Sequence, residues 1–179
     1  MIWRPFRHGG EEHDLSHLHP ATITYAQEAK GGKPARCYTV DVIFSMHCFT
    51  RGIKAGECPD PNLCYRDDRE TRVFDFQRYE LSHQLPDIVR GLCGRKVYHS
   101  GKGNFFTIEI VDKRTGARLE YEIYFVASRS SRSGRVNLVV QSAYVRDPEH
   151  LANRPKLKPI GFPVILFNVL NNKAIRVPK

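Results

Sequence analysis

Apolar and polar residues alternate along three consecutive segments in the second half of the chain: Asn104–Val111, Arg118–Val126 and Arg135–Val145. Alternation with a period of two is typical of β-strands with one buried face, and the short connections favour an antiparallel meander. The residues expected on the buried faces are Phe106, Ile108, Ile110, Leu119, Tyr121, Ile123, Phe125, Val136, Leu138 and Val140.

Two short helices are predicted immediately before the meander. Apolar and aromatic residues recur at helical spacing over 76–83 and again over 85–92, and Pro86 suits the first turn of the second helix. We therefore expect an α+β fold in which a short helical hairpin packs on a curved antiparallel β-sheet meander.

A further alternating segment, Tyr38–His47, predicts a strand earlier in the chain. Its apolar face carries Tyr38, Val40, Val42, Phe44 and Met46. The other face carries mostly polar side chains, so we expect this face to contact solvent.

The remaining segments suggest one domain with two appendages. Residues 1–22 are polar and histidine-rich and are interpreted as an exposed N-terminal arm, and 23–179 as a single α+β domain. The alternative is that the arm folds back to complete a site. Residues 51–72 are predicted to form a long polar loop inserted into the domain. A basic C-terminal tail carries Arg154, Lys156 and Lys158, and an apolar helix is expected over Val164–Leu170.

The charge of the chain narrows the classes of partner. There are 28 Lys and Arg residues against 19 Asp and Glu, giving a net charge of +9 and a pI near 9.5. Such an excess favours RNA, ribosomes or anionic surfaces, although many small basic proteins bind none of these. No segment has the 18 or more apolar residues of a membrane span, and the N-terminus lacks the apolar core of a signal peptide. These features, with five irregularly spaced cysteines, predict a cytoplasmic protein with no membrane partner.

Four residues could in principle hold zinc: His47, Cys48, Cys58 and Cys64. Their types are those that zinc accepts in tetrahedral geometry. Their spacing lacks the tight pair of cysteines found in most structural sites, so free thiols are the favoured interpretation and no cofactor is expected.

The end of the Tyr38–His47 strand groups residues that could cleave RNA. Ser45 and His47 share its polar face, and Arg51 follows closely. Cleavage through the 2′-hydroxyl needs a base, an acid and a cation near the phosphorane, and it needs no metal. The alternative is that His47 is a partly buried sheet residue with a structural hydrogen bond.

Arginines and aromatic residues alternate after residue 64 in a pattern that suits RNA. Arginine side chains bind phosphate in a bidentate manner, and aromatic rings stack on unpaired bases. The residues predicted to bind RNA are Arg69, Arg72, Tyr79, Lys102, Lys156 and Lys158. Acidic residues interspersed among them leave a solvated, salt-bridged surface as the alternative.

The last strand of the meander ends in polar side chains. Simple alternation places Ser142 and Tyr144 on the same face as Val136, Leu138 and Val140, and Arg146 follows. These groups would either be satisfied core hydroxyls or form the floor of a concave site.

The order of elements over residues 74–147 resembles the barnase–RelE group of small ribonucleases. The segments that carry the resemblance are Arg78–Ser82, Leu85–Ile88 and Gln141–Val145. It implies a helical hairpin before an antiparallel sheet, with catalytic basic and aromatic groups on late strands and the tail. The comparable positions are Tyr144, Arg146, His99 and Lys102, and the first hundred residues have no counterpart in a minimal toxin of this type.

These observations lead to two hypotheses. The first is a metal-independent endoribonuclease of toxin or mobile-element type, acting on RNA or at the ribosome and able to pair with a protein antitoxin. In it, His47 is the general base or acid, Arg51 and Arg78 bind phosphate, Tyr144 stacks or donates a proton, and Arg146 stabilises the transition state. The second is a non-catalytic module that binds nucleic acid or protein and regulates growth or stress adaptation.

Overall fold

The structure is a computed structural model that describes residues 2–29, 31–32, 34–112, 118–146 and 154–178. The parts of the predicted arm, meander and tail at residues 1, 113–117, 147–153 and 179 lie outside this description. In the described part, no helix is long and apolar enough to cross a membrane.

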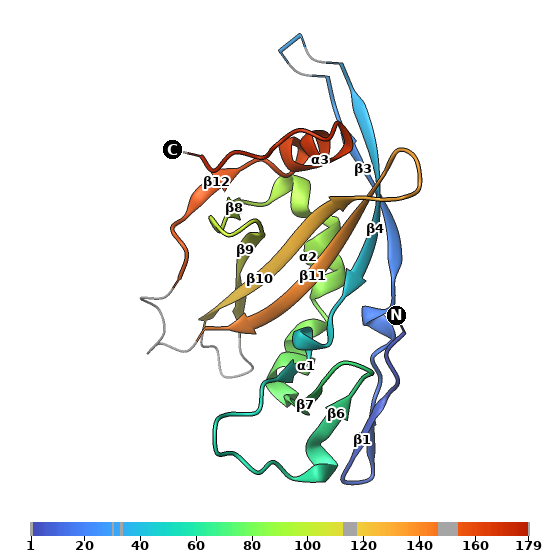
Figure 1. Cartoon of the computed structure of the whole chain (residues 1–179), viewed down its shortest axis with the longest axis vertical. Coiled ribbons are helices and arrows are strands. Elements are labelled where there is room, and N and C mark those ends of the chain that lie inside the picture. The colour runs from blue at the N-terminus through green and yellow to red at the C-terminus, as the bar shows by residue number, and fades with distance from the viewer. Residues whose placement is uncertain (1, 30, 33, 113–117, 147–153, 179) are drawn as a thin grey trace.

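One large mixed sheet organises the molecule (Figure 1). Its strand order is β12-β8-β9-β10-β11-β4-β3, and every neighbouring pair is antiparallel except β11 and β4, which are parallel. The strands are β3 (Ala21–Gln27), β4 (Arg36–Phe44), β8 (Val97–His99), β9 (Phe105–Asp112), β10 (Arg118–Arg129), β11 (Arg135–Val145) and β12 (Lys158–Ile160).

Three α-helices accompany the large sheet, and Figure 1 shows β10 and β11 in front of α2. They are α1 (Phe76–Ser82), α2 (Leu85–Arg90) and α3 (Phe162–Leu170). The predicted bend between the first two helices and the predicted last helix are confirmed. The fold is therefore α+β, as the pattern of the chain predicts.

The alternation predicted for β4 is confirmed, since all five residues of its expected apolar face are buried. The strand nevertheless ends at Phe44 rather than at His47. The Ser45 hydroxyl accepts a hydrogen bond from the His47 amide and caps a short 3-10 turn, η2 (Met46–Cys48). His47 therefore lies on a turn beyond the strand.

The long polar loop predicted over 51–72 is wrong in part, because this stretch contributes to a small three-stranded sheet at the lower end of the molecule in Figure 1. Its strand order is β5-β7-β6, and both neighbouring pairs are antiparallel. The elements here are β5 (Thr50–Arg51), a 3-10 turn η3 (Pro61–Leu63), β6 (Cys64–Arg66) and β7 (Thr71–Phe74).

The N-terminal segment packs against the body instead of extending into solvent. It contains β1 (Phe6–His8), β2 (Glu11–His13) and a 3-10 turn η1 (Ser16–Leu18). Trp3, Phe6, Leu15 and Leu18 belong to the core cluster, and the Trp3 indole donates a hydrogen bond to the Phe44 carbonyl. The prediction of an exposed arm is wrong, because burial of these four apolar side chains holds the segment against the core.

The expected buried face is confirmed for Val136, Leu138 and Val140 of β11, but that of β9 is wrong in part. In β9, Phe105 and Thr107 lie on the helix-covered face, while Phe106 is buried against Tyr124 and Ile110 is 59% exposed. Because Phe105 pairs with Phe125, the register with β10 fixes this orientation.

In β11, a β-bulge changes the face of the residues that follow Val140. Phe125 pairs with Val140 and Tyr124 with Ser142, so Gln141 is the extra residue. A bulge shifts the side-chain alternation by one position. Ser142 and Tyr144 therefore leave the core face for the open face of the sheet, and Ala143 takes the buried position.

Candidate functional site

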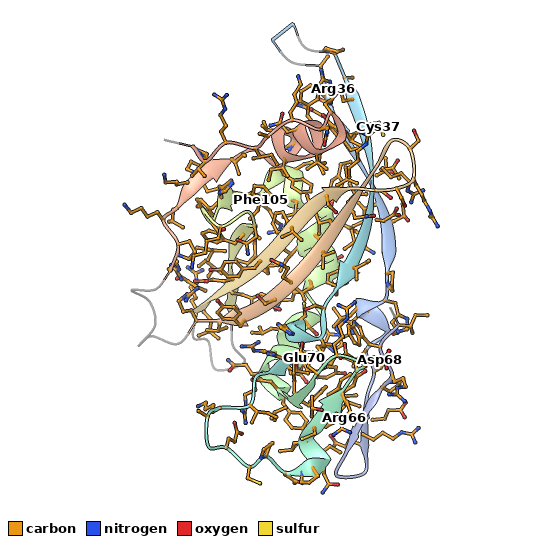
Figure 2. All side chains as sticks on the ribbon, viewed as in Figure 1. Arg36, Cys37, Arg66, Asp68, Glu70 and Phe105 are labelled. Carbon is orange, nitrogen blue, oxygen red and sulfur yellow. The ribbon has the colours of Figure 1, made fainter. Side chains whose placement is uncertain are left out.

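A cavity of about 770 Å³ opens between the large sheet and the turn that joins β6 to β7. The ends of β4 and β11 form one wall, the β6–β7 turn forms another, and the N-terminal segment contributes Trp3. Figure 2 shows Arg66, Asp68 and Glu70 together at the small-sheet end of the molecule, with Arg36 and Cys37 at the opposite end. The lining residues that carry chemistry are Ser45, His47, Asp67, Arg69, Glu70 and Ser142. We refer to this cavity as the reaction cleft.

His47 and Glu70 form the most distinctive pair in the reaction cleft. The His47 Nε2 atom lies 2.6 Å from Glu70 Oε1, and the two side chains are 38% and 40% exposed. The hydrogen bond with His47 is the main reason that the pKa of Glu70 lies below its usual value, and a second bond from Arg72 acts in the same direction. Glu70 is therefore ionised at neutral pH beside an imidazole that is open to a ligand.

Both members of the pair are held by local capping interactions. The Ser45 hydroxyl caps η2 and donates a hydrogen bond to the Gln141 carbonyl at the bulge of β11. On the other side, Asp67 Oδ1 accepts hydrogen bonds from the Arg69 and Glu70 amides at 2.8 and 2.9 Å. These Asx-type bonds shape the turn that presents Glu70 to His47.

Arg72 supports the pair from β7. Its Nε donates to the Thr50 hydroxyl at 2.9 Å, and its Nη1 lies 3.3 Å from Glu70 Oε2. The Arg72 side chain is 14% exposed, so this predicted RNA-binding residue acts mainly within the protein.

Arg78 connects the His47 turn to Tyr144. Its Nη1 donates to the carbonyl oxygens of His47 and Thr50 at 3.1 and 2.9 Å, and its guanidinium lies 5.2 Å from the centre of the Tyr144 ring. Burial lowers the pKa of Arg78, with the nearby Asp75 carboxylate opposing that effect. The structure thus brings three of the predicted catalytic residues, His47, Arg78 and Tyr144, into one neighbourhood.

Arg146 also lies near Tyr144, with its guanidinium 5.5 Å from the ring centre. It forms an ion pair with Glu122, whose side chain is completely buried. Burial alone would raise the pKa of Glu122, but hydrogen bonds from Arg146, Tyr124 and Arg154 outweigh it, and the pKa is lowered. The hydrogen bonding with Glu122 in turn raises the pKa of Arg146. Arg146 is therefore committed to an internal ion pair, and its positive charge would act on a ligand through the electrostatic potential rather than by direct contact.

The other predicted site residues lie apart from this cluster. The Arg51 guanidinium is held by two hydrogen bonds to Glu57, at 2.8 and 2.6 Å. Tyr79 is buried and stacks edge-on against His13 and His83, which indicates a packing role.

The three predicted lysines do not line the reaction cleft; one lies in the turn before β9 and two lie at or next to β12. Lys102 is exposed in the β8–β9 turn, and Asn104 of that turn donates to the Gln141 side chain at the rim of the reaction cleft. Lys156 is exposed before β12, and Lys158 lies on that edge strand beside His99. The Lys102 turn is thus joined to the reaction cleft by a hydrogen bond to one of its lining residues.

The alternative zinc site is not assembled. Among the residues that the structure describes, no group of three or more histidine, cysteine, aspartate or glutamate side chains could hold a metal ion. Cys48 is buried, and burial raises the pKa of its thiol to about 12, whereas Cys58 is exposed. The four candidate ligands are thus dispersed between core and surface.

Two residues of the reaction cleft escaped sequence reasoning. Glu70 belongs to a run of mixed charges and carries no local signal for a partner 23 positions away. Trp3 was assigned to an exposed arm, although a lone tryptophan near the N-terminus could have suggested a buried anchor.

Comparisons with known proteins identify the family to which the chain is related. The model of the YjaZ family matches residues 5–170. Protein YjaZ from Escherichia coli (strain K12) is 32% identical over 179 residues, covering 98% of this chain and 95% of that protein. No solved structure matches the chain. The match of the family model to nearly the whole chain, together with this relative, shows that the chain belongs to the YjaZ family.

Proposed function

We propose that this protein is a metal-independent endoribonuclease of the cytoplasm and that the reaction cleft is its active site. The observation that carries the proposal is the His47–Glu70 pair, 2.6 Å apart and partly exposed in the reaction cleft. A histidine and a carboxylate are the commonest general acid and base groups in enzymes. The net charge of +9 supports a polyanionic substrate.

The chemistry requires only groups that the chain and the substrate supply. Glu70, ionised at neutral pH, accepts the proton of a ribose 2′-hydroxyl as the 2′-oxygen attacks phosphorus. Protonated His47 gives its proton to the 5′-oxygen as the phosphorus–oxygen bond breaks. The products are a 2′,3′-cyclic phosphate and a 5′-hydroxyl, so atoms and protons balance without water or metal. This assigns His47 the acid role and makes Glu70 the base.

The arginines around the pair divide into two groups. Arg69 lines the reaction cleft and is exposed, so it can contact the phosphate directly. Arg78 and Arg146 are held by protein groups. In this proposal they remain with these partners and make the electrostatic potential in the cleft more positive, which stabilises the charged phosphorane. RNA, free or on the ribosome, is the proposed substrate, and a protein antitoxin is a proposed partner.

A second candidate is a non-catalytic module that binds nucleic acid or protein. One observation favours it: Arg51, Arg78 and Arg146, all predicted to act in catalysis, are each committed to protein partners. Exposed basic residues around the cleft would then bind RNA without cleaving it.

The experiment that separates the candidates is incubation of labelled total RNA with purified protein in EDTA. The variants are His47→Asn and Glu70→Gln, and Glu57→Gln serves as the matched control because it neutralises a carboxylate in a similar ion pair outside the cleft. The nuclease proposal expects cleavage by the wild type and the control, with a loss of about 100-fold or more in the two cleft variants. RNA retention without cleavage, both in free RNA and on translating ribosomes, would contradict it and favour the binding module.

A further inference from the structure

We infer that a second cavity beside the reaction cleft is a binding subsite for a backbone phosphate of the RNA, an inference that rests on the proposed function. This cavity has a volume of about 250 Å³ and lies between the N-terminal segment and the β6–β7 turn. Its lining residues are Ile2, Trp3, Arg4, Tyr65, Arg66, Asp67, Asp68 and Arg69. We call it the arginine cavity.

Three arginines from separate places in the chain converge on this cavity. Arg4 comes from the N-terminal segment, Arg66 from the end of β6, and Arg69 from the following turn, and all three are exposed. Guanidinium groups that converge from several elements favour phosphate, since each can donate two parallel hydrogen bonds to its oxygens.

The charge of these arginines is not neutralised by ion pairs in the way that is usual in this protein. Most of the arginines described around the two sheets form ion pairs with carboxylates, among them Arg51, Arg72, Arg78, Arg135 and Arg146. Within the described part of the chain, none of Arg4, Arg66 and Arg69 has a carboxylate oxygen within 4 Å.

The two aspartates that also line the cavity do not cancel this charge in full. The lining contains three guanidinium groups and two carboxylates. In addition, one oxygen of Asp67 accepts hydrogen bonds from the amides of its own turn. The cavity is therefore cationic overall.

The cavity is also held in shape around these arginines. The Tyr65 hydroxyl donates to the Arg4 carbonyl at 2.8 Å, which fixes the N-terminal segment against β6. Arg66 Nε donates to the Thr71 hydroxyl at 2.8 Å, which orients its guanidinium. A subsite prepared in this way loses less conformational entropy when it binds its ligand.

The position of the arginine cavity gives it a role in the reaction. Trp3, Asp67 and Arg69 line both this cavity and the reaction cleft, so the two form one continuous surface. A strand with its scissile phosphate beside His47 can therefore place a neighbouring phosphate among the arginines.

Size and burial decide which part of the RNA binds there. The volume is below the range of about 300–1,000 Å³ of pockets that enclose whole small ligands, so it suits a single phosphate-bearing unit. The two aromatic side chains, Trp3 and Tyr65, are only 4% and 9% exposed, so they offer no face on which a base could stack. Recognition is therefore of the backbone and is independent of sequence.

The test uses a single-stranded oligonucleotide with 2′-deoxyribose throughout, which the proposed chemistry cannot cleave. Binding is followed by fluorescence anisotropy over a range of NaCl concentrations and by the emission of Trp3, the only tryptophan of the chain, which lines both cavities. The variant is Arg4→Gln/Arg66→Gln, because these two arginines line the arginine cavity and do not line the reaction cleft. The matched control is Arg129→Gln/Arg132→Gln, which removes one exposed arginine at the end of β10 and one in the connection that follows.

We expect Trp3 emission to change on binding and the salt dependence of log K to become shallower by about 0.7 in the cavity variant, since the subsite binds one phosphate and each single-strand phosphate contact contributes about 0.7. The control should keep the wild-type slope. Equal slopes in both variants, or binding without any change in Trp3 emission, would overturn the subsite. If the wild type cleaves RNA through His47 while these results fail, the subsite is wrong and the nuclease stands; the reverse pattern leaves a phosphate subsite in a binding module.

Discussion

The imidazole of His47 lies 2.6 Å from the carboxylate of Glu70, although the two residues belong to different sheets. His47 follows strand β4 of the large sheet, and Glu70 lies in the turn between β6 and β7 of the small sheet. The pair exists only because η2, capped by Ser45, and the Asp67 turn meet across the reaction cleft. This relationship is the basis of the proposed chemistry.

The buried carboxylate of Glu122 should be important for stability. Glu122→Gln leaves Arg146 and Arg154 without their shared buried partner, and we expect a loss of about 3 kcal/mol in the free energy of unfolding. Glu120→Gln is the control, because Glu120 is 48% exposed and pairs with Arg154 only; its expected cost is below about 1 kcal/mol. Urea denaturation measures both. Similar losses in the two variants would show that Glu122 is not a buried anchor.

Arg146 is a poor target for mutations that test catalysis, because its partner Glu122 is buried. Truncating Arg146 would leave Glu122 with an incomplete set of partners in a buried position, so lost activity could reflect unfolding. His47 is the better target because its side chain is 38% exposed and its partner Glu70 remains solvated.

Two buried tyrosines should respond oppositely to removal of the hydroxyl. The Tyr121 hydroxyl is buried and has no hydrogen-bond partner among the described residues, and burial raises its pKa. Tyr121→Phe should therefore leave stability unchanged or raise it by up to about 1 kcal/mol. Tyr25→Phe removes a 2.6 Å hydrogen bond to the Val89 carbonyl and should cost about 1 kcal/mol. Thermal unfolding of the two variants tests this contrast, which a comparable loss in both would refute.

The packed N-terminal segment should be sensitive to acid. His17 stacks on His83 with ring centres 3.9 Å apart, and its Nε2 lies 2.8 Å from the Ser82 hydroxyl. Burial, and then the proximity of His83, lower the pKa of His17 to about 4, while Asp14 opposes and His19 reinforces the change. The unfolded chain, with an ordinary value near 6.5, therefore binds a proton that the folded protein excludes between these two values.

Stability should consequently fall as the pH drops from about 6.5 to 4, by about 1–2 kcal/mol from this group after allowance for its partial exposure. Urea midpoints measured at pH 7 and pH 4.5 report the change. His17→Gln should reduce the difference between the two midpoints, and an unaltered pH dependence in that variant would exclude His17 as its source.

Periodicity predicted the elements of this fold well and their orientation less well. Strands β4, β9, β10 and β11 and both short helices follow directly from local spacing. The orientation of Tyr144 could not be predicted, because the extra residue Gln141 becomes visible only when β11 is paired with β10. Phe105 and Phe106 are both apolar, so alternation alone could not choose between them, and the register with β10 decides the face.

The candidate site was predictable in its histidine and not in its partners. His47 stands out because it follows a strand whose polar face points to solvent. Glu70 and Trp3 reach it from segments that look like a loop and an arm, and they do so through tertiary contacts: the Asp67 turn and the Trp3–Phe44 hydrogen bond. Arg51 looked equally suitable in sequence, but Glu57, six residues away, binds its guanidinium.

The most direct test of the central claim compares two fluorescently labelled single strands in EDTA: an RNA, and the same sequence with one 2′-deoxyribose at the cleavage position. We expect the wild type to cut the RNA to a 2′,3′-cyclic phosphate and to spare the deoxy-substituted bond, and His47→Asn to be slower by about 100-fold or more while remaining folded. Equal cleavage of both strands, or undiminished cleavage by His47→Asn, would contradict the account.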